Sequence, residues 1–100
     1  MSTALKKPIP DSQPEREKTE TEKIVELESA TETIAAYIGY LTTEIHKEED
    51  QPTPDEEKLR ALSAQKNVIL EERQAITPDN QDLIAKARYV YGPIMKALYA

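Results

Sequence analysis

The longest regular pattern in the chain lies in residues 20–50, which read ETEKIVELESATETIAAYIGYLTTEIHKEED. Apolar side chains recur there three and four residues apart, with one threonine among them: Ile24, Leu27, Thr31, Ile34, Ile38, Leu41 and Ile45. This spacing is the heptad seam of a helix that packs against another helix. Thr19 and Glu22 fit a capping box just before the seam. We therefore predict one helix over residues 20–49, and a similar pattern at residues 12–15 leaves an earlier start open.

Prolines divide the rest of the chain. Pro52 disfavours helical geometry at the residue before it, so the first helix should end there. A second helix is predicted over residues 54–76, with Thr53 as its cap and Pro54 in its first turn. Its inward side chains are expected to be Leu59, Leu62, Val68, Ile69 and Ile76.

A third helix is predicted over residues 78–91, where a second Thr-Pro-Asp sequence restarts the chain. Its apolar set is Leu83, Ile84, Ala87, Val90 and Tyr91. Proline lacks the N–H that a helix needs, so Gly92 and Pro93 should kink or break this helix before a final turn that ends at residue 99.

These elements predict an all-α fold with one domain over residues 20–100. Short connections make neighbouring helices antiparallel, so we expect a long hairpin with the third helix against it, in an up-down-up order. With the turn near Pro52, Ile45 should face Leu59, and Arg73 should lie near Glu28 or Glu32. Residues 1–19 are expected to be a disordered or weakly ordered N-terminal tail, because they are polar and rich in proline.

The apolar content is low for a chain of 100 residues. Leu, Ile and Val together make 20 residues, and there is no Phe or Trp. Chains with so lean a core often gain apolar contacts by self-association, so a homodimer is the expected oligomer. The small residues Ala35, Gly39 and Thr43 lie four apart, away from the seam. They could admit either the third helix or a second subunit.

The negative charge is concentrated in one part of the chain. The net charge is −6, and residues 24–50 carry seven acids against Lys47 alone. We define the acidic tip as the carboxylates around the predicted hairpin turn: Glu44, Glu48, Glu49, Asp50, Asp55, Glu56 and Glu57. Such a cluster favours encounter with a basic protein surface, although part of it also suits a helix start. We predict that the tip binds a partner.

Tyrosine is the only aromatic residue type in the chain. Tyr suits interfaces because it buries area and keeps a polar end. Tyr37 and Tyr40 flank the predicted seam and are added to the partner-binding set. Half-buried positions inside one bundle explain tyrosines equally well. Tyr89 and Tyr91 lie on opposite sides of a helical turn, so only one of them is expected in the core.

The residue types exclude most chemistry. There is no Cys and one histidine, His46, so no metal site is expected. Phosphate-binding glycine loops and nucleophile–base sets are absent, and we expect no catalytic residue and no cofactor. No basic cluster favours nucleic acid, and no apolar run could span a membrane. The polar N-terminal residues lack a signal-peptide pattern, so a cytoplasmic location is expected.

The sequence therefore predicts a non-enzymatic protein-binding module that acts as an inhibitor or chaperone of a partner with a basic surface. In length, charge and helix pattern it resembles small bacterial immunity proteins and antitoxins, which act by binding a partner. It is also similar in outline to the helical-hairpin subunits of secretion needles, which gives the alternative of a self-assembling structural component. A more distant alternative is a metal-dependent enzyme whose carboxylates converge across a dimer.

Overall fold

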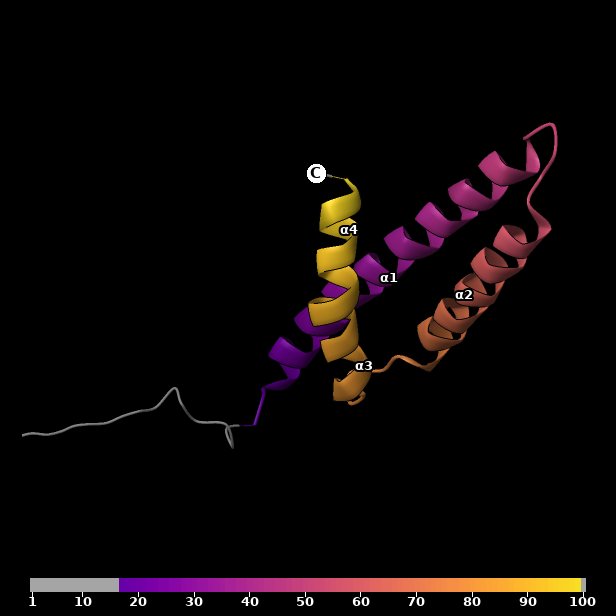
Figure 1. The fold of residues 1–100 in the computed structure, drawn as a ribbon. Coiled ribbons are helices and arrows are strands. Elements are labelled where there is room, and N and C mark those ends of the chain that lie inside the picture. Colours follow the sequence, from indigo (N-terminus) through magenta and orange to yellow (C-terminus); the bar gives the residue numbers. More distant parts are fainter. Residues whose placement is uncertain (1–16, 100) are drawn as a thin grey trace, which may run out of the picture.

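The structure, a computed structural model, describes residues 17–99, and these residues form helices and no strand (Figure 1). Helix α1 spans Glu20–Glu49, and α2 spans Glu56–Ala75. Three contiguous segments follow: α3 (Gln81–Lys86), the π-helical η1 (Ala87–Tyr91) and α4 (Gly92–Leu98). Together they make one rod, which we call the C-terminal helix. The prediction of an all-α protein is confirmed.

The start of α1 is fixed by a capping box. The Thr19 hydroxyl accepts a hydrogen bond from the Glu22 N–H at 3.1 Å, and the Glu22 carboxylate accepts one from the Thr19 N–H at 2.9 Å. Just before the box, the Lys18 ammonium donates to Glu26 at 2.7 Å and to Gln81 at 3.0 Å, which ties the start of α1 to the C-terminal helix. The rest of the predicted tail, residues 1–16, lies outside the described residues.

Helix α2 begins two residues later than predicted, and Thr53 is not its cap. The Asp55 carboxylate instead accepts hydrogen bonds from the N–H groups of Glu57 and Lys58, both at 3.1 Å. Asp is among the strongest capping residues and, unlike Thr, brings a negative charge to the positive helix start. Asp55 therefore sets the helix start, and Pro54 remains in the loop.

Of the kink or break predicted at Gly92 and Pro93, the break does not occur. The chain instead widens into the π-helical turn η1, in which the Gly92 N–H bonds to the Ala87 carbonyl five residues back. Proline cannot donate to the carbonyl four residues before it, and its ring crowds that carbonyl. A wider turn gives the ring room, so the helix continues through Pro93 to Leu98. The helix also starts later than residue 78, because Asn80 is its cap.

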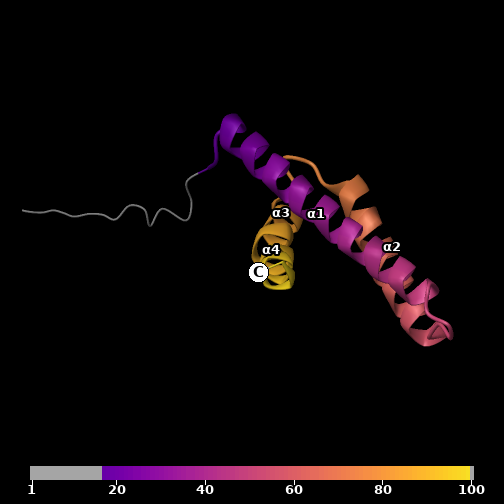
Figure 2. The same ribbon diagram turned by 90° about the horizontal axis from the view of Figure 1, so that it is seen from above.

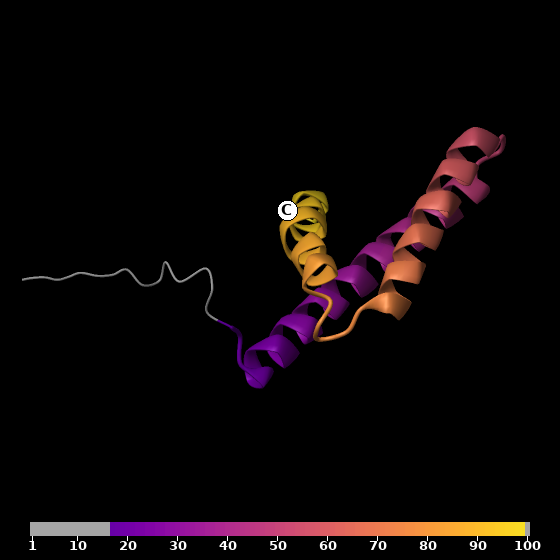
Figure 3. The same cartoon turned by 90° about the horizontal axis from the view of Figure 1, so that it is seen from below.

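Helix α1 is the spine of the molecule. The chain reverses after α1, and α2 runs back beside its C-terminal part, while the C-terminal helix crosses α1 (Figures 1 and 2). Viewed from below, α2 and the C-terminal helix lie on different sides of α1 (Figure 3). Both outer helices pack on α1, whereas neither packs extensively on the other. The three helices therefore form a splayed arrangement around one central rod.

The core follows from this arrangement. Its buried side chains come from all three rods: Ala30, Ile34, Tyr37 and Leu41 of α1, Ile69 of α2, and Ile84, Ala87, Tyr91 and Met95 of the C-terminal helix. Tyr37 lies outside the predicted seam and is nevertheless buried, because α1 has two partners and so a wider apolar arc than a two-helix seam. Of the tyrosine pair in η1, Tyr91 is buried and Tyr89 is exposed, as the spacing predicts.

The inward position predicted for Val68 is wrong. Val68 is 51% exposed, because α2 and the C-terminal helix do not close on each other, and Val90 of the C-terminal helix is 47% exposed. Within residues 17–99, Arg73 forms no ion pair with Glu28 or Glu32. Arg73 is exposed beside the last turn of α2, where solvation competes with an ion pair.

The small-residue stripe of α1 is uncovered. Ala35, Gly39 and Thr43 are all exposed, and a Cβ atom built on Gly39 would meet nothing within 4 Å. The C-terminal helix packs on another face of α1, so it is not the helix that this stripe was expected to admit.

Candidate interaction surface

The acidic tip surrounds the end of α1, the loop and the start of α2, and Glu48 lies at its centre. One Glu48 oxygen accepts the Asp55 N–H at 2.9 Å, and the other pairs with the Lys58 ammonium at 3.2 Å. Glu48 thus closes the loop from one helix to the next. The Asp55 N–H is the main cause of a lowered pKa for Glu48, and Lys58 adds to it. Glu48 therefore supports the fold of the tip.

We expect Glu48→Gln to lower thermal stability at neutral pH. A pKa below the ordinary 4.5 means that the folded state favours the carboxylate. This stabilisation is present above about pH 4.5 and is lost as pH falls through the lower folded value. The melting temperatures of Glu48→Gln and wild type, measured by circular dichroism, should differ at pH 7 and converge near pH 2. Glu49→Gln is the control and should match wild type at both; a pH-independent difference for Glu48→Gln would contradict the role of its charge.

The other tip carboxylates form no bond between α1 and α2. Glu44 pairs with Lys47 at 3.3 Å and Glu49 with His46 at 3.2 Å, each within α1. Asp55 caps α2. The remaining three are exposed and form no ion pair among residues 17–99: Asp50, Glu56 and Glu57. Three free carboxylates and the exposed pair at Glu49 leave the tip strongly negative.

Each of the two tyrosines of the predicted partner-binding set packs against a tyrosine from the C-terminal part of the chain. The Tyr37 ring packs edge-on against Tyr91, with 5.1 Å between ring centroids, and its hydroxyl accepts a hydrogen bond from Gln65 at 2.6 Å. Tyr37 is therefore part of the core. Tyr40 is half-buried and packs edge-on against Tyr99, with 6.4 Å between centroids. Tyr40 lies one helical turn before Glu44 on α1, at the border of the acidic tip.

Glu72 links α2 to the C-terminal helix, and nothing in the sequence indicated this contact. Its carboxylate accepts hydrogen bonds from the Tyr91 hydroxyl at 2.5 Å and from the Lys86 ammonium at 2.6 Å. Burial is the main cause of a raised pKa for Tyr91, and the bond to Glu72 is the main cause of a raised pKa for Lys86. The spacing of Lys86 and Tyr91 gave no signal, because the π turn between them alters which side chains share a face. We call this contact the Glu72 clamp.

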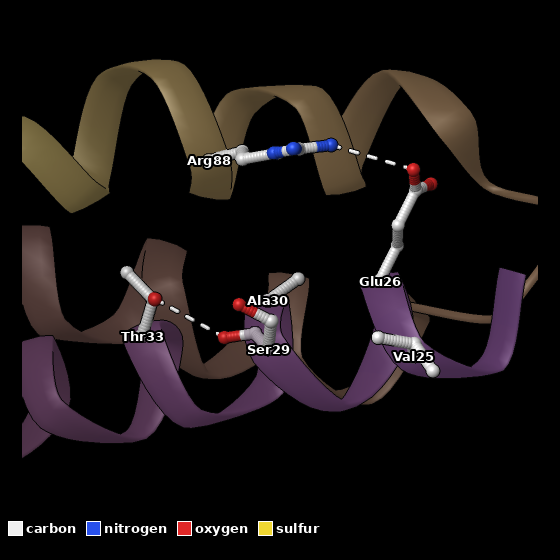
Figure 4. A pocket seen from close by; sticks show the side chains of 6 residues that line it. All are labelled: Val25, Glu26, Ser29, Ala30, Thr33 and Arg88. Atoms are coloured by element: carbon white, nitrogen blue, oxygen red, sulfur yellow. Dashed lines mark hydrogen bonds and ion pairs between the residues drawn. The ribbon is translucent and has the colours of Figure 1, made fainter. Parts of the chain in front are cut away.

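A shallow hollow lies between α1 and η1, where Arg88 reaches across to Glu26 at 3.3 Å (Figure 4). It has a volume of about 270 Å³. The other residues that line it have short side chains: Val25, Ser29, Ala30 and Thr33. Glu26 is its one acid, and Arg88 and Lys18 neutralise it. The Thr33 hydroxyl donates to the Ser29 carbonyl. The hollow thus offers a ligand small apolar surface and no poised acid–base pair.

The part of the chain from residue 17 to residue 99 holds no group of three or more His, Asp or Glu side chains placed to bind a metal ion. The His46 ring lies 3.2 Å from a Glu49 carboxylate oxygen. Over the same residues, none of the helices combines the length and the apolar character needed to cross a membrane.

Comparisons with protein-family models, with curated proteins and with solved structures found no match to this chain.

Proposed function

We propose that this protein is a non-enzymatic binding module that inhibits or chaperones another protein by docking the acidic tip of its α1–α2 hairpin on a basic surface. The observation that carries the proposal is the state of the tip carboxylates: Asp50, Glu56 and Glu57 are exposed without a described ion pair. Asp50 also lies at the C-terminal end of α1, where a negative charge opposes the helix dipole. This arrangement costs stability, and a cationic partner would relieve it.

The mechanism is steric occlusion guided by charge. A concentrated negative surface speeds encounter with a basic groove and disfavours acidic surfaces. The rigid loop helps, because the bonds of Glu48 to Asp55 and Lys58 fix the ends of both helices before binding and so reduce the entropy lost on association. If the partner were a nuclease, the tip carboxylates would stand in for phosphates.

We expect a tagged full-length chain to retain a basic protein in stoichiometric amount from native extract at low salt and to release it at high salt, where charge interactions are screened. The triple variant Asp50→Asn, Glu56→Gln, Glu57→Gln should fail to retain it. A matched control removes three acids elsewhere: Glu28→Gln, Glu32→Gln and Glu71→Gln. The control should retain the partner. Absence of a stoichiometric partner, or equal loss from both variants, would contradict the proposal.

A second candidate function is self-assembly into a dimer or a larger helical array. It is favoured by the N-terminal turns of α1, where Ile24 and Val25 are about half exposed because α2 is ten residues shorter than α1. Sedimentation across protein concentration tests this candidate, since a fully helical monomer at high concentration would exclude it.

A further inference from the structure

Aliphatic side chains flank the open side between α2 and the C-terminal helix. On α2, Val68 lies between Gln65, which bonds to Tyr37, and Glu72, which bonds to Tyr91. Residues three and four apart share a helix face, so Val68 is on the side of α2 that is turned toward the C-terminal helix. On that helix, Val90 lies one residue before Tyr91, and Ile94 and Leu98 follow Val90 at intervals of four.

These four side chains form what we call the aliphatic patch: Val68, Val90, Ile94 and Leu98. Each is between 38% and 51% exposed, although the outer helices approach closely enough at one end for the Glu72 clamp to form. Beyond the clamp the helices splay apart (Figure 1). Exposed aliphatic side chains gathered on one side of a small protein are typical of a binding surface.

Acidic side chains lie farther along the same side of the molecule, toward the tip. Glu57 shares the α2 face of Gln65 and Val68, at spacings of eight and eleven residues, and Glu44 lies seven residues after Tyr37 on α1. Both belong to the acidic tip. The open side therefore runs from an aliphatic region near the clamp toward a negative region at the tip.

We infer that the aliphatic patch binds an amphipathic helix of a partner protein, with an aliphatic stripe against Val68, Ile94 and Leu98 and with Lys or Arg residues at the end nearest the tip. This inference rests on the proposed function and specifies the partner's binding element. Proteins commonly recognise a partner by binding the apolar face of its amphipathic helix in an apolar groove. A partner with a basic end complements the acidic tip, whereas a second copy carries the same net charge of −6 and the same tip. The C-terminal helix also uses Lys86 and Arg88 within its own chain.

The probe is a synthetic labelled helical peptide of about five turns, roughly 18 residues, with a leucine stripe and four lysines at one end. We expect saturable binding to the full-length protein, measured by fluorescence anisotropy. Val68→Asp should weaken binding by about 10-fold or more, which is about 1.4 kcal/mol. Val25→Asp is the matched control: it is another exposed valine, 57% exposed, on a different face, and should leave binding within about twofold of wild type. Leu98→Asp is the second test variant should Val68→Asp lose helicity.

Peptides with Glu in place of Lys, or Ser in place of Leu, should bind at least about 10-fold more weakly. Three results would overturn the inference: no effect of Val68→Asp and Leu98→Asp, equal binding of the Glu peptide, or no binding of the parent peptide.

A dimer that Val68→Asp dissociates would assign the patch to a second copy. Tighter peptide binding by full-length chain carrying Leu5→Ser and Ile9→Ser would assign it to the chain's own N-terminal segment. Either also overturns the inference. Partner capture that depends on the tip but not on Val68 would leave the proposed function standing alone.

Discussion

Replacement of Ile34 by Ala should destabilise the protein by about 2–5 kcal/mol, the range for truncation of a fully buried isoleucine. Ile34 is 0% exposed and lies where both outer helices meet α1. A domain of this size has a total stability of only about 4–12 kcal/mol. The loss is therefore a large share of the whole, and the urea midpoint measured by circular dichroism at 25 °C should fall steeply.

Ile24→Ala is the matched control, because it makes the same substitution in the same helix. Ile24 is 48% exposed, so the lost burial is small, and the better helix propensity of Ala offsets part of it. We expect a change below about 1 kcal/mol. A loss for Ile24→Ala as large as that for Ile34→Ala would contradict the exposed position of Ile24. It would mean that another molecule covers the start of α1 in solution.

Removal of the Tyr91 hydroxyl should weaken the attachment of the C-terminal helix to α2. Tyr91→Phe deletes a hydrogen bond to a charged acceptor, and such bonds contribute about 1.5–3 kcal/mol. We expect the lower end of that range, because Glu72 keeps its bond to Lys86. Tyr89→Phe is the control: Tyr89 is 69% exposed, and Phe keeps the ring that stacks on Arg88. Urea unfolding at neutral pH should separate the two variants.

The effect of Tyr91→Phe should vanish at alkaline pH. Folding raises the pKa of Tyr91 above its ordinary 10.0, so the hydroxyl stabilises the fold below pH 10 and this contribution is lost as pH rises through the folded value. Folding also raises the pKa of Lys86 above its ordinary 10.5, so the contribution of its ammonium group is likewise lost as pH rises. Wild type should therefore lose stability above about pH 10 and approach Tyr91→Phe, while Tyr89→Phe tracks wild type throughout. A constant gap between wild type and Tyr91→Phe from pH 7 to pH 11 would contradict the raised pKa of Tyr91, which comes first from burial and then from the bond to Glu72.

The candidate site was only partly predictable. Charge and proline spacing in the sequence identify the carboxylates of the tip, because charge is a property of residue type. Their separate roles depend on tertiary geometry: Glu48 closes the loop, Asp55 caps α2, and Asp50, Glu56 and Glu57 form no ion pair with any residue from 17 to 99. Tyr37 shows the opposite case, because a residue chosen for an interface is buried against Tyr91.

Local patterns in the sequence determined that the chain is helical and where α1 starts, since the capping box of Thr19 and the heptad spacing act over a few residues. The arrangement of the outer helices was decided only by tertiary packing. A heptad seam describes two helices, whereas α1 holds two partners at once, and the buried arc widens to include Ala30 and Tyr37. Because those partners do not close on each other, Val68 and Val90 stay exposed in spite of their apolar spacing. Periodicity states which side of a helix is apolar, and only the packed structure states whether anything covers it.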